Sequence, residues 1–268
     1  MDNRKAITKP VIHAAIVLAV FYAIEIAMVY LNIFPDYNVL LCADIVIRII
    51  MGIAVLVILK GYSKRGESKY SVRELFSNRM PTVTWIVIIP MILYIFAPFI
   101  KLFTAYIFTT SVIVTLTVVL VQQVAVGFFE ESVHRALMMN GLIKNNTGTV
   151  KQRLFTVAVA GVFFGLSHIP NFVFGENPLL QVPGCITFGI FIAAVYMLSD
   201  NILLVMILHT LSDSTHHIVD GLFGYVQDAP ICRAVEISRD VIQYAVLPLM
   251  AVLICIFCDK LKGGNKRR

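Results

Sequence analysis

Charged side chains are scarce in this sequence. Asp, Glu, Lys and Arg make up 14% of the 268 residues and apolar residues 59%, against roughly 25% and 45–50% in average soluble proteins. A soluble globule of this size cannot bury such an apolar surplus, because much of any folded surface must face water. We therefore expect lipid to surround much of the chain, which excludes a soluble enzyme, a disordered protein and an ordinary nucleic-acid binder.

The sequence also lacks the cysteine pattern of a disulfide-built secreted domain. The number of cysteines is odd and most of them lie inside apolar runs, which is typical of small hydrophobic residues. The last two form a C-x-x-C without a flanking turn or a second pair, so we expect neither a redox nor a metal role there. The five cysteines are Cys42, Cys185, Cys232, Cys255 and Cys258.

Eight apolar stretches are long enough, or nearly so, to cross a membrane, which takes about 20 residues in a helix. Their hydrophobicity is continuous rather than alternating, which predicts helices and excludes a closed β-barrel. We expect an all-α polytopic membrane protein with about eight transmembrane helices and a single membrane domain over residues 1–268. The stretches are 11–31, 39–60, 82–100, 106–129, 154–173, 183–199, 201–223 and 241–258.

The lysines and arginines predict the orientation, since basic loops stay in the cytoplasm. Of the 22 basic residues, 18 fall in the N-terminal tail, the 60–80 loop, the 135–153 segment and the C-terminal tail. Both termini are therefore predicted to be cytoplasmic. The basic C-terminal tail is read as a solvated end near anionic headgroups, and no nucleic-acid partner is expected.

Three ionisable residues lie in the first two spans, where each costs several kcal/mol unless it is paired or faces water. Asp44 and Arg48 are four residues apart, so they share a helix face and can neutralise each other. We expect an internal ion pair there. Glu25 has no partner close to it in the sequence, and its role stays open.

Two adjacent carboxylates occur in GFFEESVHRALMMNG at 127–141, at the predicted inner end of a long apolar helix. On a helix, Glu131 lies four residues from Arg135, while Glu130 points about 100° away. This predicts one structural carboxylate, held ionised by the arginine, and one that is free to handle protons. The alternative is a salt-bridge cluster at the membrane boundary.

Two later segments also place polar residues on apolar helices. In FFGLSHIPN, His168 ends a helix before Pro170. A histidine there is either a catalytic candidate or a capping or packing residue. In HTLSDSTHHIVD, a polar stripe falls on one face of a span and must line a cavity or the bundle interior. Carboxylates and imidazoles on separate spans make a hydrolytic constellation. The stripe consists of His209, Ser212, Asp213, His216, His217 and Asp220.

Three of these segments together resemble a known family. EESVHR at 130–135 matches E-E-x-x-x-R, FGLSH at 164–168 matches F-x-x-x-H, and HTLSD at 209–213 matches H-x-x-x-N/D. This order is similar to the CPBP family of CAAX-protease and bacteriocin-processing membrane proteins, also called the Abi family. The resemblance implies an eight-helix, glutamate-dependent intramembrane endopeptidase, with its motif-bearing core at about 106–223. Family members include enzymes that remove the last three residues after a prenylated cysteine.

By motif position, the resemblance implies that Glu130 and His168 activate the water, and that His209 and Asp213 form the oxyanion-stabilising pair. Asp213 stands where the eukaryotic CAAX enzymes typically have asparagine. Because an ionised carboxylate cannot donate a hydrogen bond to an oxyanion, we expect Asp213 to orient His209 and keep it protonated.

Glu131 and Arg135 would hold the helix end that presents Glu130. The predicted span boundaries, at a rise of 1.5 Å per residue, place His168 roughly 10–15 Å farther out in the membrane than Glu130. The helix that carries His168 must then start deeper, tilt, or have other ends than predicted. We give the motif order precedence over these boundaries.

Two other functions compete with this interpretation. Two histidines and a carboxylate are also a zinc-ligand set, which keeps a zinc-dependent membrane protease open, although H-E-x-x-H is absent. A non-catalytic scaffold or peptide-immunity protein is the other. We expect no cofactor, and we expect the bilayer and a membrane-tethered or peptide substrate, lipid-modified or not, as partners. The expected location is multi-pass in the plasma membrane of a prokaryote, and the roles of His216 and His217 stay open.

Overall fold

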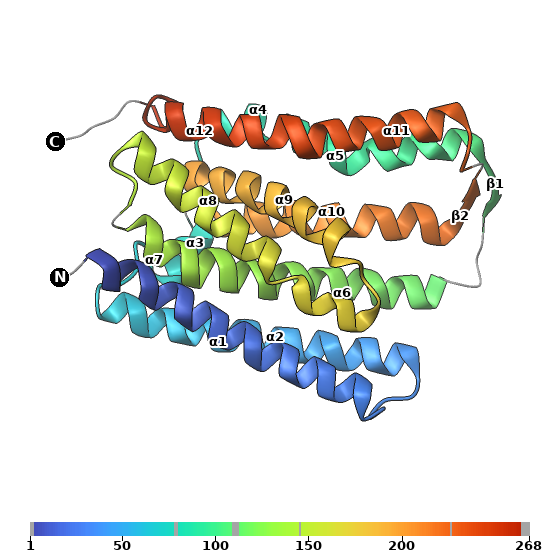
Figure 1. Ribbon diagram of the computed structural model, residues 1–268, viewed down its shortest axis with the longest axis horizontal. Helices are drawn as coiled ribbons and strands as arrows, with labels where there is room; N and C mark the ends of the chain where they lie inside the picture. Colours follow the sequence, from blue (N-terminus) through green and yellow to red (C-terminus); the bar gives the residue numbers. More distant parts are fainter. Residues whose placement is uncertain (1–2, 78–79, 109–112, 145, 226, 264–268) are drawn as a thin grey trace.

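The computed structural model describes residues 3–77, 80–108, 113–144, 146–225 and 227–263. They form a bundle of roughly antiparallel helices (Figure 1). In chain order the elements are α1 (Asn3–Tyr30), α2 (Tyr37–Lys64), α3 (Val72–Ser77), α4 (Thr84–Val87), α5 (Ile89–Phe96), the 3-10 helix η1 (Ala97–Thr104), β1 (Ala105–Phe108), α6 (Ile113–Glu131), the π-helix η2 (Ser132–Met139), α7 (Asn140–Ile143), α8 (Val150–Leu166), the 3-10 helix η3 (Ile169–Phe174), α9 (Pro178–Ser199), α10 (Ile202–Leu222), β2 (Phe223–Tyr225), α11 (Pro230–Val241), the π-helix η4 (Ile242–Val246) and α12 (Leu247–Leu261).

The predicted membrane architecture is confirmed. Within the described residues, seven helices are long and apolar enough to cross a membrane, and a shorter apolar one covers Ile89–Thr104. This shorter helix corresponds to the predicted stretch 82–100, which the structure divides into α4, α5 and η1. Pro90 and Pro98 lie at the starts of α5 and η1, and proline there supplies no N–H group to continue the preceding helix.

The start of α1 and the end of α12 lie at the same end of the bundle (Figure 1). The two ends of a chain lie on the same side of a membrane when the chain crosses it an even number of times. Which side of the membrane that end faces stays a prediction from the basic residues.

The predicted stretch 106–129 has the wrong boundaries. Its beginning forms β1, which pairs antiparallel with β2 in a two-stranded sheet, and α6 starts only at Ile113. The helix then passes through η2 and α7 without a break and ends at Ile143. Glu130 therefore lies near the middle of a span over Leu116–Ile143 and not at its inner end. Arg135, which was predicted to lie in a cytoplasmic connection, lies inside this span.

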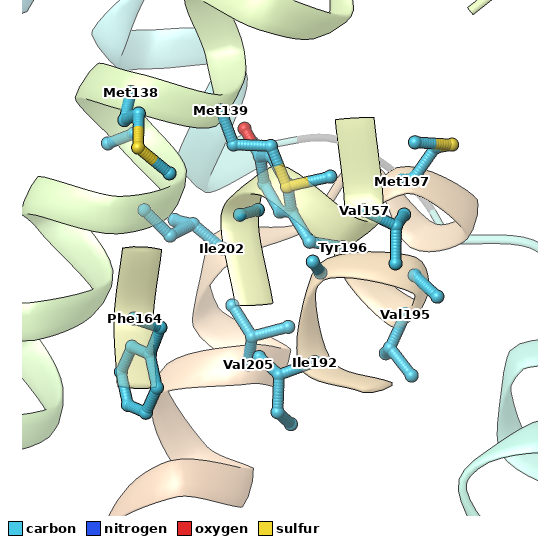
Figure 2. Close-up of a cluster of buried hydrophobic side chains, with 14 of the residues drawn as sticks. Met138, Met139, Val157, Phe164, Ile192, Val195, Tyr196, Met197, Ile202 and Val205 are labelled. Carbon is cyan, nitrogen blue, oxygen red and sulfur yellow. The ribbon is translucent and has the colours of Figure 1, made fainter. Parts of the chain in front are cut away.

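The centre of the bundle is formed by α9, where every residue from 191 to 199 is buried. Apolar side chains from η2, α8, α9 and the start of α10 pack together around it (Figure 2). Helices α1 and α2 lie side by side at one edge of the bundle (Figure 1). Their outer faces expose large apolar side chains such as Ile16, Ile50 and Val57, as expected of surfaces that face lipid.

Helices α8 and α9 approach closely through glycines. A Cβ atom added at Gly161 would lie 2.7 Å from the backbone N of Ile190, and one added at Gly165 would lie 2.9 Å from the backbone N of Ile186. Small residues allow such backbone contact between membrane helices. Since His168 follows α8, this packing also fixes the place of a predicted site residue.

The close packing predicts that Gly161→Ala lowers the free energy of unfolding by about 1–3 kcal/mol, the usual cost of overpacking. Val162→Ile is the matched control, because it adds one methylene group to an exposed position on the same helix. Thermal unfolding in detergent measures both variants. An unchanged midpoint for Gly161→Ala would contradict the close approach of α8 and α9.

Candidate active site

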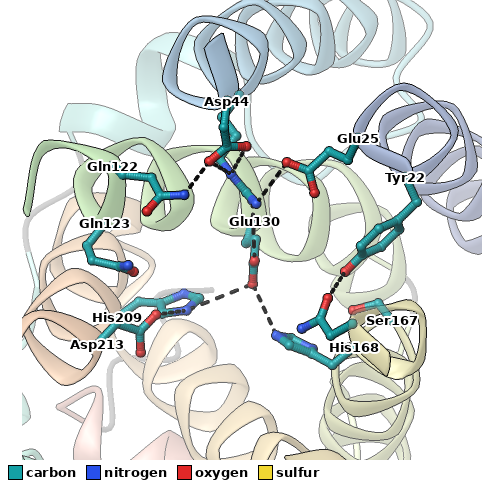
Figure 3. Close-up of polar contacts among 12 residues, drawn as sticks. Tyr22, Glu25, Asp44, Gln122, Gln123, Glu130, Ser167, His168, His209 and Asp213 are labelled. Atoms are coloured by element: carbon teal, nitrogen blue, oxygen red, sulfur yellow. Dashed lines mark hydrogen bonds and ion pairs between the residues drawn. The ribbon is translucent and has the colours of Figure 1, made fainter. Parts of the chain in front are cut away.

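The predicted site residues meet at a cavity of about 390 Å³ whose lining includes Glu130, His168 and Asp213. Polar side chains reach it from α1, α2, α6 and α10 and from the segment after α8 (Figure 3). His209 is buried and lies beside Glu130. The structure thus brings together all four residues to which the family resemblance gives a catalytic role.

Glu130 is at the centre of this group (Figure 3). Its Oε2 lies 3.6 Å from His168 Nε2 and 3.9 Å from His209 Nε2. The predicted difference in depth between Glu130 and His168 is therefore wrong. The cause is the extension of α6 through η2 and α7, which places Glu130 in mid-span, level with the end of α8.

The imidazole of His168 is oriented by the last turn of α8. Its Nδ1 lies 2.8 Å from the main-chain oxygen of Phe164, and the ring packs against the Phe164 ring at 4.7 Å between centroids. A carbonyl oxygen only accepts, so Nδ1 must be the protonated nitrogen that donates. In neutral His168 the Nε2 lone pair then faces the Glu130 carboxylate.

Glu131 joins two of the other site residues. Its Oε1 accepts hydrogen bonds from Arg135 Nη1 at 3.1 Å and from His209 Nδ1 at 2.8 Å. The Glu131 and Arg135 side chains are both fully buried, and Arg135 also donates to the main-chain oxygen of Gly189 on α9 at 3.2 Å. The expected Glu131–Arg135 pair is present. Its contact with His209 was not expected, because no pattern within one helix relates residues this far apart in the sequence.

Asp213 lies on the other side of the His209 ring. Its Oδ2 is 3.4 Å from His209 Nε2, and its side chain is 36% exposed at the cavity. The expected neighbourhood of Asp213 and His209 is present. However, the short hydrogen bond that fixes this ring is the one that His209 Nδ1 donates to Glu131, whereas Asp213 approaches Nε2, the nitrogen that faces Glu130.

The remaining polar residues of α10 and η2 take other positions. Ser212 is buried, and His217 Nε2 lies 3.3 Å from Gln123 Nε2. The side chains of His216 and Asp220 lie outside the described residues. His134 turns away from the Glu130 carboxylate and instead donates from Nδ1 to the main-chain oxygen of Glu130 at 2.8 Å.

The sequence reasoning missed that the first two spans contribute to this site. The expected Asp44–Arg48 pair is present at 2.8 Å, but Arg48 also contacts Glu25 at 3.4 Å and Glu130 at 3.7 Å. Glu25, Asp44 and Arg48 thus all line the same cavity as Glu130. The sequence did contain a signal for them, because an ionisable residue inside an apolar span is by itself a candidate for a functional site.

The same residue types could also form a metal site or, for the cysteines, a disulfide. Across the ranges given above for the structure, no group of three or more His, Cys, Asp and Glu side chains is placed so that it could hold a metal ion. The five cysteines are free, and Cys255 and Cys258 are buried.

The fold and the site together define a helical multi-pass membrane protein with an intramembrane cluster of carboxylates and histidines. Residues 111–215 match the family model described as "Rce1-like: Type II CAAX prenyl endopeptidase Rce1-like". This segment carries all seven residues of the three motifs, and the match confirms the resemblance to the CPBP family. No curated protein and no solved structure matches the chain.

The buried charges make a prediction for Glu131. Glu131→Ala removes the partner of a fully buried guanidinium and is expected to lower the free energy of unfolding by about 3–5 kcal/mol. Denaturant titration in detergent measures this loss.

The control for Glu131→Ala is Asp228→Ala, which breaks the exposed pair of Asp228 with Arg233 and should cost at most about 1 kcal/mol. Equal stability of the two variants would show that Arg135 does not depend on Glu131.

Proposed function

We propose that the chain is a glutamate-dependent intramembrane endopeptidase of the CAAX-protease type. The observation that supports this most directly is the convergence of Glu130 Oε2, His168 Nε2 and His209 Nε2 within 3.9 Å at a cavity inside the bundle. The three residues come from three separate spans. The match of residues 111–215 to the type II CAAX prenyl endopeptidase model supports the same class of reaction.

In this proposal, Glu130 and His168 activate a water molecule. Their facing atoms are 3.6 Å apart, so one oxygen atom fits at hydrogen-bond distance from both. Among the described residues, no hydrogen-bond donor reaches the buried Glu130 Oε2. A carboxylate and an imidazole lone pair both accept protons, and together they can deprotonate the attacking water.

His209 is proposed to stabilise the oxyanion. Three carboxylates surround its ring, with Glu131 at Nδ1 and Asp213 and Glu130 at Nε2. An imidazolium, which carries a proton on each nitrogen, fits these neighbours better than a neutral ring. Its Nε2–H can then donate to the negative oxygen that develops at the substrate carbonyl, and a charged donor does so more strongly than a neutral one.

The reaction then balances as an ordinary hydrolysis. The water oxygen bonds to the carbonyl carbon while its proton passes to Glu130 or His168. The carbon–nitrogen bond breaks, and the same proton goes to the departing amine. Glu131 and Arg135 hold His209 and the helix in place, and Asp213 adds negative charge beside His209.

The proposed substrate is a membrane-tethered peptide, lipid-modified or not, because the site lies within the spans. The proposed mechanism requires no cofactor. The plasma membrane of a prokaryote stays a prediction.

This function predicts that Glu130→Gln loses proteolysis by a factor on the order of 10²–10⁴, the usual contribution of a general base, and remains folded. The rate of cleavage of a prenylated, membrane-tethered peptide by the purified protein in liposomes measures the loss. Glu74→Gln is the matched control, since Glu74 is exposed on α3 away from the cavity. Equal cleavage rates for wild type and Glu130→Gln would contradict the catalytic role of Glu130, whereas no cleavage by the wild type would favour a non-catalytic scaffold.

The same assay with a strong chelator tests the zinc alternative. Full activity in excess chelator is expected from a glutamate mechanism. Loss of activity that added zinc restores would instead establish a zinc-dependent membrane protease.

A further prediction concerns Asp213. Asp213→Ala removes a negative charge beside His209 and should lower kcat by about 10²-fold, the scale of one lost oxyanion contact. Asp213→Asn should lose less, because its amide can donate to the oxyanion itself. The comparison is the pH–rate profile of each variant with that of Asp240→Asn, an exposed control on α11. Wild-type activity of Asp213→Ala across about pH 6–8 would rule out the proposed support of His209.

A further inference from the structure

Arg48 meets three carboxylates with its three nitrogen atoms. Nε lies 2.8 Å from Asp44 Oδ1, Nη2 lies 3.4 Å from Glu25 Oε1, and Nη1 lies 3.7 Å from Glu130 Oε1. These carboxylates come from α2, α1 and α6. Arg48 itself lies outside residues 111–215 and outside the three motifs that resemble the CPBP family.

The guanidinium group is fixed in position and in plane. Its central carbon lies over the Phe21 ring at 4.5 Å, and its side chain is only 12% exposed. Asp44, which contacts Nε with both carboxylate oxygens, is itself held by Gln122 at 2.6 Å. Nη1 is therefore directed at Glu130 by contacts that do not include Glu130.

The two oxygen atoms of Glu130 have different neighbours. Oε1 faces Arg48, while Oε2 faces His168 and His209. When a fixed cation attracts one oxygen of a carboxylate, the carboxylate cannot rotate freely about the bond that joins it to the rest of the side chain. Arg48 thus fixes the orientation of the Glu130 carboxylate, with one oxygen toward the guanidinium group and the other toward the two histidines.

Arg48 also bears on the charge of Glu130. Among the described residues near Glu130, Arg48 and Arg135 are permanent cations. Arg135 is paired with Glu131 and Arg48 with Asp44, and of the two it is Arg48 that contacts Glu130 itself. An opposite charge at this distance favours the ionised carboxylate, whereas nearby carboxylates disfavour it. Within the described part of the chain, the titratable and charged groups around Glu130 include Tyr22 and Glu25 on α1, Asp44 and Arg48 on α2, Arg135 on η2, His168 after α8, Glu176 before α9, Cys185 on α9, and His209 and Asp213 on α10.

We infer that Arg48 is a positioning residue for the proposed proteolysis: it places a fixed positive charge against Glu130 Oε1 and directs Glu130 Oε2 at His168 and His209. This inference rests on the proposed role of Glu130 as a base. Asp44 and Glu25 act one step further away by holding the guanidinium group. Lysine is a poor substitute, because a single ammonium group cannot face three carboxylates with a planar fork.

The test compares Arg48→Gln and Arg48→Lys with Arg153→Gln. Arg153 lies on α8, away from the cavity. It is a matched control because it is also a buried arginine paired with a carboxylate, that of Asp259 on α12. A fourth protein, Arg48→Gln with Asp44→Asn, removes both charges of the tight pair and serves if Arg48→Gln alone does not fold.

For Arg48→Gln we expect kcat to fall by a factor on the order of 10², the scale of a displaced catalytic group, with a smaller change in KM. The acid limb of the pH–rate profile should move to higher pH by about 1–3 units, the usual effect of losing an adjacent opposite charge. Arg48→Lys should recover the acid limb more fully than kcat, because it keeps the charge and loses the planar geometry. Arg153→Gln should change stability but neither of these quantities.

Infrared difference spectra give a readout that does not need activity. Subtracting the spectra of Glu130→Gln isolates the carboxyl band of Glu130, and its growth on acidification measures proton uptake. In Arg48→Gln this uptake should occur at higher pH than in the wild type, whereas Arg153→Gln should leave it unchanged.

The outcomes separate the inference from the proposed function. If wild type and Glu130→Gln cleave equally, the proposed function fails. If Glu130→Gln is inactive but Arg48→Gln keeps the wild-type kcat, acid limb and Glu130 infrared band, only the inference about Arg48 fails. A loss of kcat in Arg48→Gln without any shift of the acid limb or the band also overturns it, because a structural role alone explains that result.

Discussion

A single buried carboxylate, that of Glu131, ties together the helices that form the site. Its Oε1 accepts from Arg135 on η2 and from His209 on α10, and Arg135 reaches on to the backbone of α9. Inside a membrane each of these polar groups would be costly alone. Pairing them satisfies the charges and at the same time fixes the relative positions of α6, α9 and α10.

The position of Glu130 follows from that arrangement. It precedes Glu131 on the same helix and therefore points about 100° away from it, into the cavity instead of toward Arg135. There it lies against His168, whose height is set by the packing of α8 on α9 through Gly161 and Gly165. Adjacent carboxylates thus have separate surroundings: one is enclosed by fixed donors, and the other borders open space with two imidazoles beside it.

Contacts within one helix could be predicted from the sequence, and contacts between helices could not. Asp44 with Arg48 and Glu131 with Arg135 are both four residues apart, and both pairs are present. Glu25 with Arg48 and Glu131 with His209 join different helices, and hydrophobic periodicity carries no information about which helices are neighbours. The same limit explains why Glu130 was predicted at the end of a span. A charged segment is typical of the end of a span, and only its buried partners on other helices show that it lies in the middle.

The packing of α2 along α6 decides which parts of the chain are needed to enclose the site. Gly52 on α2 lies against the Phe128 ring on α6, close enough that Asp44 and Arg48 cover the side of α6 that carries Gln122 and Glu130. Residues 111–215 on their own would turn this charged side toward hydrocarbon. The N-terminal hairpin of α1 and α2 is therefore a wall of the polar compartment, and the segment that carries the motifs is not a self-sufficient module in a lipid environment.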